Sequence, residues 1–149
     1  MSLISTLLKP EYILLDLDAS SKEALFETIA SHIAPALQLE PKIIEKSLVI
    51  REKLGSTGLG QGVAIPHGRI KQLKQAAGIF IRTREEVPFG APDDMPVRLL
   101  FVLLVPEQAT DLHLQILSEL AQLFGDRTLR ERLLTISSAD EAYQLLTAT

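Results

Sequence analysis

The residues best suited to chemistry are two histidines, His67 and His113, and one arginine, Arg51. His67 lies in GSTGLGQGVAIPHGR (residues 55–69), whose five glycines give the backbone more freedom than a stable helix tolerates. Such a loop lets another molecule approach closely and leaves a side chain uncovered. At neutral pH one imidazole nitrogen is free to act as base, ligand or nucleophile. We therefore interpret His67 as reactive; the alternative is a solvated turn histidine.

His113 and Arg51 are the candidate partners of this histidine. His113 stands near the amino end of a predicted helix, which favours an anion and a neutral imidazole; the alternative is a core histidine satisfied by a backbone carbonyl. Arg51 precedes the glycine loop, and its planar fork of donors suits an anion, whereas the alternative is a solvated surface arginine. His32 lies in another predicted helix, without a surrounding loop, and is interpreted as structural.

These residue types favour phosphoryl chemistry over other reactions. The glycine loop lacks the lysine and hydroxyl residue of a Walker loop, breaks the dinucleotide fingerprint, and runs from helix into strand. No serine triad and no metal-spaced acids accompany the histidines, which argues against hydrolysis and zinc chemistry. Phosphoryl transfer mainly requires positioning and charge stabilisation, so few side chains suffice. We expect neither a metal nor another cofactor.

Strands and helices that position these residues are predicted from hydrophobic spacing and turn residues. After one helical turn within residues 3–8, strands are expected at 12–18, 63–66, 77–83 and 97–106. Helices are expected from Ser20 or Ser21 to about 36, from Pro41 to about Gly55, from Thr110 or Asp111 to Gly125, at 127–135, and from Ser137 or Ser138 to 147.

The predicted order of these elements is β-α-α-β-β-β-α-α-α. The nearly all-apolar strand at 97–105 must be hidden on both faces, so we expect an α/β (α+β) fold with one mixed sheet sandwiched between helical layers. The length of 149 residues, of which 46% are apolar and 23% charged, predicts a single domain (1–149) with one core.

Composition also excludes some classes of partner, bond and cellular location. The net charge is −4 and the basic residues are scattered, so a nucleic-acid partner is not expected. The absence of cysteine excludes disulfides and thiolate metal sites. No basic amino-terminal segment precedes a long apolar run, so we expect a cytoplasmic location without membrane insertion.

The segment REKLGSTGLGQGVAIPHGR (51–69) resembles the active-site signature of the fructose/mannitol-type (type 2) enzyme IIA domains of the bacterial phosphoenolpyruvate-dependent phosphotransferase system. The shared pattern is Glu52, then Leu59-Gly60, then VAIPHG at 63–68. The resemblance extends over essentially the whole chain, including LLFVLLVP at 99–106 and HLQILSELA at 113–121. Within the family, the GSTG wording is most similar to nitrogen-regulatory enzyme IIA proteins, which stand alone at about this length.

The resemblance implies that His67 is the phosphorylated residue, with Nε2 as the attacking atom, and that an HPr-like phosphohistidine carrier is the donor. It further implies that His113 hydrogen-bonds the phosphoryl group and that Arg51 is the anion-binding arginine. Leu59, Val63 and Ile65 are expected to form the apolar centre of the docking surface.

Three functions remain open from the sequence. The first is a regulatory phosphocarrier whose phosphorylation changes its binding to targets such as potassium-transport or sensor proteins. The second is a sugar-specific enzyme IIA that passes the phosphoryl group to a separate IIB protein. The third is a non-catalytic binding module of the same fold, against which the intact Pro66-His67-Gly68 and His113 argue.

Overall fold

The computed structural model describes residues 3–108 and 111–148, which form one mixed sheet between helices. The strand order is β1-β5-β6-β3-β2, with β4 also paired to β6. β1 runs parallel to β5, β5 is antiparallel to β6, and β3 and β4 both run parallel to β6. The strands are β1 (Leu8–Leu17), β2 (Gly58–Gly60), β3 (Val63–Ala64), β4 (His67–Ile70), β5 (Ala77–Val87) and β6 (Val97–Pro106).

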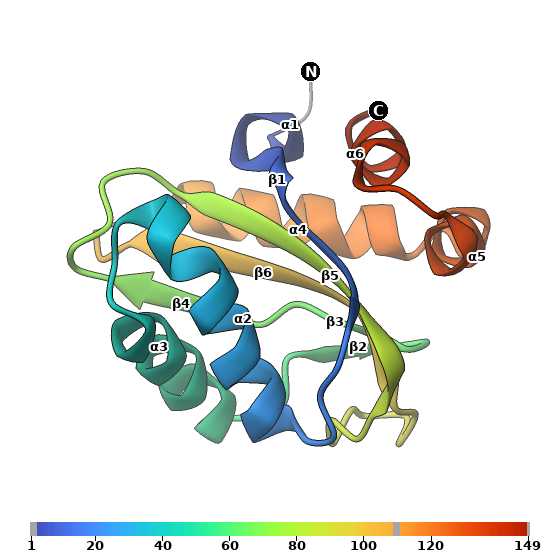
Figure 1. Ribbon diagram of the computed structural model, residues 1–149, viewed down its shortest axis with the longest axis horizontal. Coiled ribbons are helices and arrows are strands. Elements are labelled where there is room, and N and C mark those ends of the chain that lie inside the picture. The colour runs from blue at the N-terminus through green and yellow to red at the C-terminus, as the bar shows by residue number, and fades with distance from the viewer. Residues whose placement is uncertain (1–2, 109–110, 149) are drawn as a thin grey trace.

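Helices lie on both sides of this sheet (Figure 1). Helices α2 and α3 cover the near face in this view, and α4 crosses behind β5 and β6, with α5 and α6 at the right. The bounds are α1 (Ile4–Leu7), α2 (Lys22–Leu37), α3 (Pro41–Lys53), α4 (Asp111–Phe124), α5 (Arg127–Thr135) and α6 (Ala139–Thr147). The predicted mixed sheet between helical layers is confirmed, and the longer elements follow the predicted order.

Strand β6 is the centre of the core. It extends over 97–106, as predicted, and nearly all of its side chains are buried, because neighbours pair along both edges and helices cover both faces. Buried side chains from the sheet and from both helical layers form one hydrophobic cluster with it. No helix in 3–108 or 111–148 combines the length and the apolar character that crossing a membrane requires.

The helix boundaries agree with the capping signals. Ser21 Oγ accepts from Ala24 N and Ser138 Oγ from Glu141 N, so the second serine of each predicted pair is the cap. Pro41 occupies the first turn of α3. Asp111 is already inside α4, and the other predicted cap of this helix, Thr110, lies outside the described residues.

Three strand predictions were incomplete. β1 begins at Leu8 and passes through Pro10, because an edge strand tolerates a residue without an N–H donor. β5 continues beyond residue 83 to Val87. The glycine-rich segment was expected to hold one strand, at 63–66. It instead holds three short strands, β2, β3 and β4, over residues 58–70.

The hairpin between β2 and β3 explains part of the glycine content. Gln61 and Gly62 form its two-residue turn with φ values of 60° and 80°. Positive φ at both turn positions matches the twist of a hairpin, and glycine adopts it without steric cost. The Asp93 carboxylate accepts a hydrogen bond from Gln61 N and anchors the turn.

Candidate functional site

The three residues singled out in the sequence lie together although they come from distant elements. Arg51 is in the last turn of α3, His67 is the first residue of β4, and His113 is in the first turn of α4. Arg51 Nε donates to His67 Nε2 over 3.1 Å. The imidazole rings of His67 and His113 meet edge to face, with centroids 5.1 Å apart. The fold therefore brings all three predicted site residues into one cluster.

A break in strand pairing places His67 at this point. β3 and β4 pair along the same edge of β6, Val63 opposite Leu99 and His67 opposite Leu103. Between them, Pro66 has no N–H to donate, and only its carbonyl bonds to the strand, accepting from Leu103 N over 2.9 Å. His67 thus begins a new strand beside the buried strand β6.

Gly68 lets helix α3 approach this strand closely. A Cβ atom at Gly68 would overlap Ser47 Oγ and lie 3.1 Å from Ser47 Cβ. Rotation of the serine side chain can relieve the overlap with Oγ, but Ser47 Cβ and the Ser47 carbonyl carbon, at 3.2 Å, would still have to shift by a few tenths of an ångström. Glycine at 68 thus sets the distance between α3, which carries Arg51, and the strand that begins at His67.

Gly68→Ala is expected to destabilise the chain by about 1–3 kcal/mol, the usual cost of forcing an added group into a packed contact. Equilibrium urea unfolding measures this loss. Ser47→Ala removes the overlapping oxygen, so the double variant is expected to lose less stability than the sum of the single variants. A Gly68→Ala protein within about 0.5 kcal/mol of wild type would contradict the close approach.

The proton on His67 is assigned by its hydrogen bonds. His67 Nδ1 lies 3.0 Å from the carbonyl oxygen of Ile65. Because that oxygen can only accept, the bond requires a proton on Nδ1, which leaves the lone pair on Nε2. Arg51 Nε donates to that lone pair, while its Nη1 donates to Gly55 O and ties the start of the loop to α3. The free lone pair of the neutral ring is therefore on Nε2.

Burial and nearby cations keep the site histidines neutral. Desolvation is the largest cause that lowers the pKa of His67 below 6.5, and the hydrogen bond to Ile65 O partly opposes it. Positive charge on Arg51 adds to the lowering. Desolvation also lowers the pKa of His113, with His67, Arg69 and Arg51 as further causes. Neutral rings with lone pairs therefore predominate near physiological pH.

His113 does not fit the alternative of a core histidine satisfied by a backbone carbonyl. Its side chain is buried, at 7% exposure, and both ring nitrogens lack a hydrogen-bond partner. A buried polar atom without a partner costs free energy unless something else binds it. The carbonyl alternative is therefore wrong for this residue, and the unpartnered ring faces His67.

Acidification is expected to destabilise the chain through these two histidines. In the unfolded chain each binds its proton near pH 6.5, whereas the folded chain binds it only at lower pH. The unfolded state therefore holds more protons in this interval, and the free energy of unfolding falls as the pH drops below 6.5 toward the lowered pKa values. Urea unfolding across this interval should show a shallower loss for His67→Gln/His113→Gln than for wild type. An equal loss of stability in wild type and in the double variant would contradict the lowered pKa values of His67 and His113.

A pocket of about 400 Å³ opens at these residues. Its lining contains two arginines and two histidines but no carboxylate: Ser47, Ile50, Arg51, Leu54, His67, Gly68, Arg69 and His113. Such a lining suits an oxyanion. In the described part of the chain, no group of three His, Cys, Asp or Glu side chains could hold a metal ion.

A second layer of polar contacts holds the glycine loop against α3. The Glu52 carboxylate accepts from Thr57 N over 2.9 Å and from Thr57 Oγ1 over 2.7 Å. Lys22 Nζ, from α2, lies 2.9 Å from the same carboxylate, whose side chain is only 6% exposed. Sequence reasoning noted Glu52 only as part of the signature and missed Lys22, Thr57 and Arg69. The sequence signal that could have revealed these contacts was the acidic residue Glu52 directly after Arg51.

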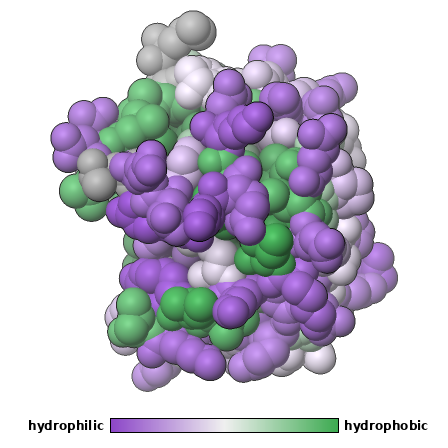
Figure 2. All heavy atoms as spheres, turned by 90° about the vertical axis from the view of Figure 1, so that its left-hand side faces the viewer, coloured by the Kyte–Doolittle hydropathy of each residue, from purple (hydrophilic) through white to green (hydrophobic). Residues whose placement is uncertain are grey.

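The apolar surface around the pocket differs from the predicted one. Val63 and Ile65 are buried in the core, so neither can form a docking surface. Both lie in the segment from β3 to β4, which runs along the buried strand β6. Leu59 is exposed, as expected. The exposed apolar side chains near the pocket are Ile50 on α3, Leu54 just after α3, and Leu112 and Leu114 on α4. Figure 2 shows apolar patches separated by hydrophilic side chains on the face that lies at the left-hand side of Figure 1.

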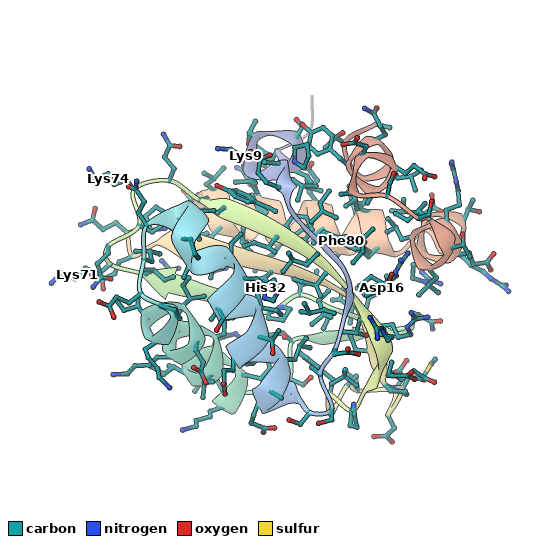
Figure 3. All side chains as sticks on the ribbon, viewed as in Figure 1. Lys9, Asp16, His32, Lys71, Lys74 and Phe80 are labelled. Carbon is teal, nitrogen blue, oxygen red and sulfur yellow. The ribbon has the colours of Figure 1, made fainter. Side chains whose placement is uncertain are left out.

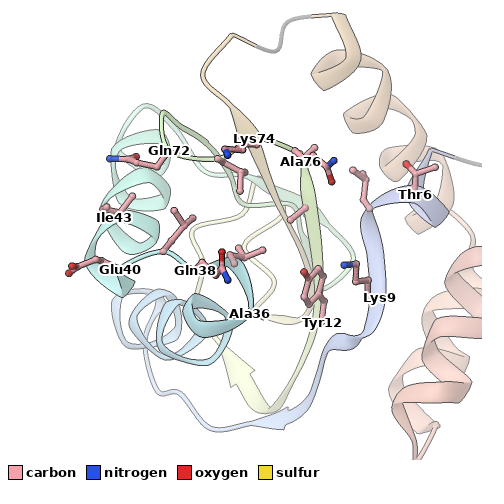
Figure 4. A pocket seen from close by; sticks show the side chains of 16 residues that line it. Thr6, Lys9, Tyr12, Ala36, Gln38, Glu40, Ile43, Gln72, Lys74 and Ala76 are labelled. Atoms are coloured by element: carbon pink, nitrogen blue, oxygen red, sulfur yellow. The ribbon is translucent and has the colours of Figure 1, made fainter.

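Two other features lie apart from the cluster. A larger cavity of about 600 Å³ is lined by α1, β1, the end of α2 and the 72–77 segment, and includes Lys9, Tyr12 and Lys74 but none of the three site residues (Figure 4). His32 lies exposed on α2, where its Nδ1 is 3.0 Å from Thr28 O (Figure 3). This histidine does not join the site.

Comparison with known proteins identifies the family. The family described as phosphoenolpyruvate-dependent sugar phosphotransferase system, EIIA 2, matches residues 6–149. A nitrogen regulatory protein of Escherichia coli K12 is 41% identical over 130 residues, which cover 87% of this chain and 80% of that protein.

Solved structures agree with this match. The nitrogen regulatory protein IIA-Ntr from Neisseria meningitidis is 52% identical and superposes with a TM-score of 0.93, covering 98% of this chain and all of its own. The Escherichia coli complex of enzyme IIA-Mtl and phosphorylated enzyme IIB-Mtl contains a chain that is 28% identical, with a TM-score of 0.80 and coverage of 95% and 98%. This chain belongs to the EIIA 2 family of the phosphoenolpyruvate-dependent sugar phosphotransferase system.

Proposed function

We propose that the protein is a phosphocarrier that accepts a phosphoryl group on His67 Nε2 from an HPr-like phosphohistidine carrier. The observation that carries the proposal is the hydrogen bond from Nδ1 to Ile65 O, which presents the Nε2 lone pair at a cationic pocket. Arg51 and His113 are the proposed phosphoryl-binding partners. The unpartnered nitrogens of His113 and the bond from Arg51 to Nε2 support those roles.

The transfer exchanges one nitrogen–phosphorus bond for another. His67 Nε2 donates its lone pair to phosphorus while the bond to the donor's ring nitrogen breaks, and the electrons of that bond stay on the donor. His67 keeps its Nδ1 proton against Ile65 O, so its ring becomes cationic on phosphorylation. A donor ring that arrives protonated leaves as neutral imidazole, and charge and protons balance.

Arg51 must change partners during this reaction. A nitrogen bonded to phosphorus has no lone pair left to accept the hydrogen bond from Arg51 Nε. The guanidinium is then free to bind the incoming phosphoryl oxygens, which provide stronger, charge-assisted acceptors than imidazole. The arginine thus covers Nε2 before transfer and neutralises the phosphoryl charge afterwards.

The proposed role is regulatory and cytoplasmic. Relatives described as nitrogen regulatory proteins support a regulatory role. In this proposal, phosphorylation changes the binding of the chain to target proteins, such as potassium-transport or sensor proteins. A phosphoryl group adds about −1.5 to −2 charges at neutral pH, by analogy with other phosphorylated residues. A target protein that docks on the exposed apolar side chains of Ile50, Leu54, Leu112 and Leu114 would meet this charge, because these residues line the pocket or flank His113.

Transfer to a separate IIB protein is the second candidate. The likeness to the IIA-Mtl chain solved with phosphorylated IIB-Mtl favours it, because the same fold there meets such a partner. A purified IIB protein that becomes phosphorylated by the phosphorylated chain would favour this role over a purely regulatory one.

The proposed function is tested by incubating the chain with phosphoenolpyruvate, enzyme I and the HPr-like carrier. Intact-mass analysis is expected to show one added phosphoryl group that is lost in acid and retained in base, as for a phosphoramidate. Phosphorus-coupled NMR of the imidazole then identifies the nitrogen, and we expect Nε2. A chain that stays unmodified while the carrier is fully charged would contradict the proposal.

A further inference from the structure

Ser47 has a hydroxyl group that the folded chain leaves without a partner. It lies in the middle of α3, four residues before Arg51, and side chains at this spacing share one face of a helix. Its Oγ is buried and makes no hydrogen bond. Serine inside a helix usually turns toward solvent or bonds to the carbonyl four residues earlier, and Ser47 Oγ does neither.

The position of this hydroxyl is next to the reactive histidine. Ser47 packs directly against Gly68, the residue after His67, and both line the pocket that His67 and His113 share. The buried side-chain atoms without partners in the described chain are Ser47 Oγ and the two ring nitrogens of His113. All three therefore belong to one pocket, and a common occupant would satisfy them.

We propose that Ser47 Oγ donates a hydrogen bond to the phosphoryl group on His67, as a third phosphoryl-binding residue beside Arg51 and His113. This inference rests on the proposed function. A phosphoryl group on nitrogen presents three terminal oxygens, which only accept hydrogen bonds. The hydroxyl, the guanidinium and the second imidazole all line the pocket and supply donors from two helices. Arg51 becomes available to the group because its bond to Nε2 ends on phosphorylation.

The decisive variant is Ser47→Ala, compared with wild type and with Ser137→Ala. Ser137 lies just before α6 and outside the pocket lining, and its hydroxyl donates to Glu141. Its variant therefore controls for the loss of a hydroxyl outside the pocket. The phosphoryl equilibrium between each protein and the charged HPr-like carrier is measured by intact mass. Ser47→Ala is expected to lower this equilibrium constant about tenfold, the effect of one hydrogen bond to a charged group, with Ser137→Ala at the wild-type value.

Urea unfolding of both states separates this role from a structural one. In the unphosphorylated protein, Ser47→Ala is expected to be as stable as wild type or more stable, because an unpaired buried hydroxyl has been removed. The stability gained on phosphorylation should be smaller in the variant than in wild type, by linkage. If the hydroxyl were needed for packing, Ser47→Ala would instead lower the free energy of unfolding of the unphosphorylated protein.

The outcomes are distinguishable. A wild-type chain that takes no phosphoryl group on His67 would overturn the proposed function and this inference with it. A wild-type chain that is phosphorylated, with a Ser47→Ala equilibrium within twofold of it, would overturn only the role of Ser47.

Discussion

His67→Gln is expected to eliminate phosphorylation while leaving the fold intact. An amide nitrogen has no basic lone pair to attack phosphorus, so no added phosphoryl group should be detected by intact mass after full charging of the carrier. The amide N–H can still donate toward Ile65 O, the acceptor of the Nδ1 proton, so the free energy of unfolding should stay within about 1 kcal/mol of wild type.

The matched control for this variant is His32→Gln. His32 is exposed on α2 and bonds only to Thr28 O, outside the pocket. We expect this variant to accept a phosphoryl group as wild type does. Phosphorylated His67→Gln, or loss of phosphorylation in His32→Gln, would show that another histidine is the acceptor.

Arg82→Met is expected to cause the largest loss of stability, about 3 kcal/mol. Arg82 is 5% exposed within β5, and its Nη1 donates to the carbonyl oxygens of Leu133 and Ile136, over 3.0 and 2.6 Å. Its Nη2 lies 3.1 Å from Asp16 Oδ1. Methionine fills much of the volume but leaves two buried carbonyls without donors, each costing about 1–3 kcal/mol. The thermal midpoint should fall by about 6–12 °C.

Arg84→Met is the control for this effect. Arg84 is two residues further along β5 and pairs with Asp18, but both side chains are more than half exposed. An exposed ion pair contributes about 0–1 kcal/mol, so this variant should unfold close to wild type. Equal losses in the two variants would mean that the carbonyl contacts of Arg82 contribute little.

The Arg82 cluster connects distant parts of the fold. Asp16 lies on β1, where the pairing with β5 shifts between Leu15 and Leu17, and its φ is 57° (Figure 3). The shift leaves Asp16 out of the regular pairing, and its carboxylate meets Arg82 on the neighbouring strand. The carbonyls belong to the end of α5 and the residue after it. One guanidinium thus ties the sheet to the carboxyl-terminal helices.

Local sequence was sufficient for the long elements. Helical spacing and capping residues predicted α2, α3, α5 and α6, since a serine cap or a first-turn proline acts through neighbours in the chain. The apolar run of β6 predicted its central position, because such a strand has no face that water can solvate. His67 was found from the glycines around it, and the signature within 51–69 predicted the family.

Contacts between distant segments decided the rest. β2, β3 and β4 contain two to four residues each, too few for a periodic pattern. β3 and β4 form because β6 offers an edge for pairing, and β2 forms by pairing with β3. Val63 and Ile65, which were expected at a docking surface, are buried because the segment from β3 to β4 runs along the buried strand β6.

The geometry of the site also depended on the tertiary structure. Sequence supplied the identities of Arg51, His67 and His113, but their distances follow from the packing of α3 and α4 around β4. A carbonyl two residues away decides which nitrogen of His67 keeps its lone pair. The burial of the Ser47 hydroxyl cannot be read from a linear sequence pattern. Residue types determine which chemistry is possible, whereas hydrogen bonding and burial, which act across the chain, decide which atom performs it.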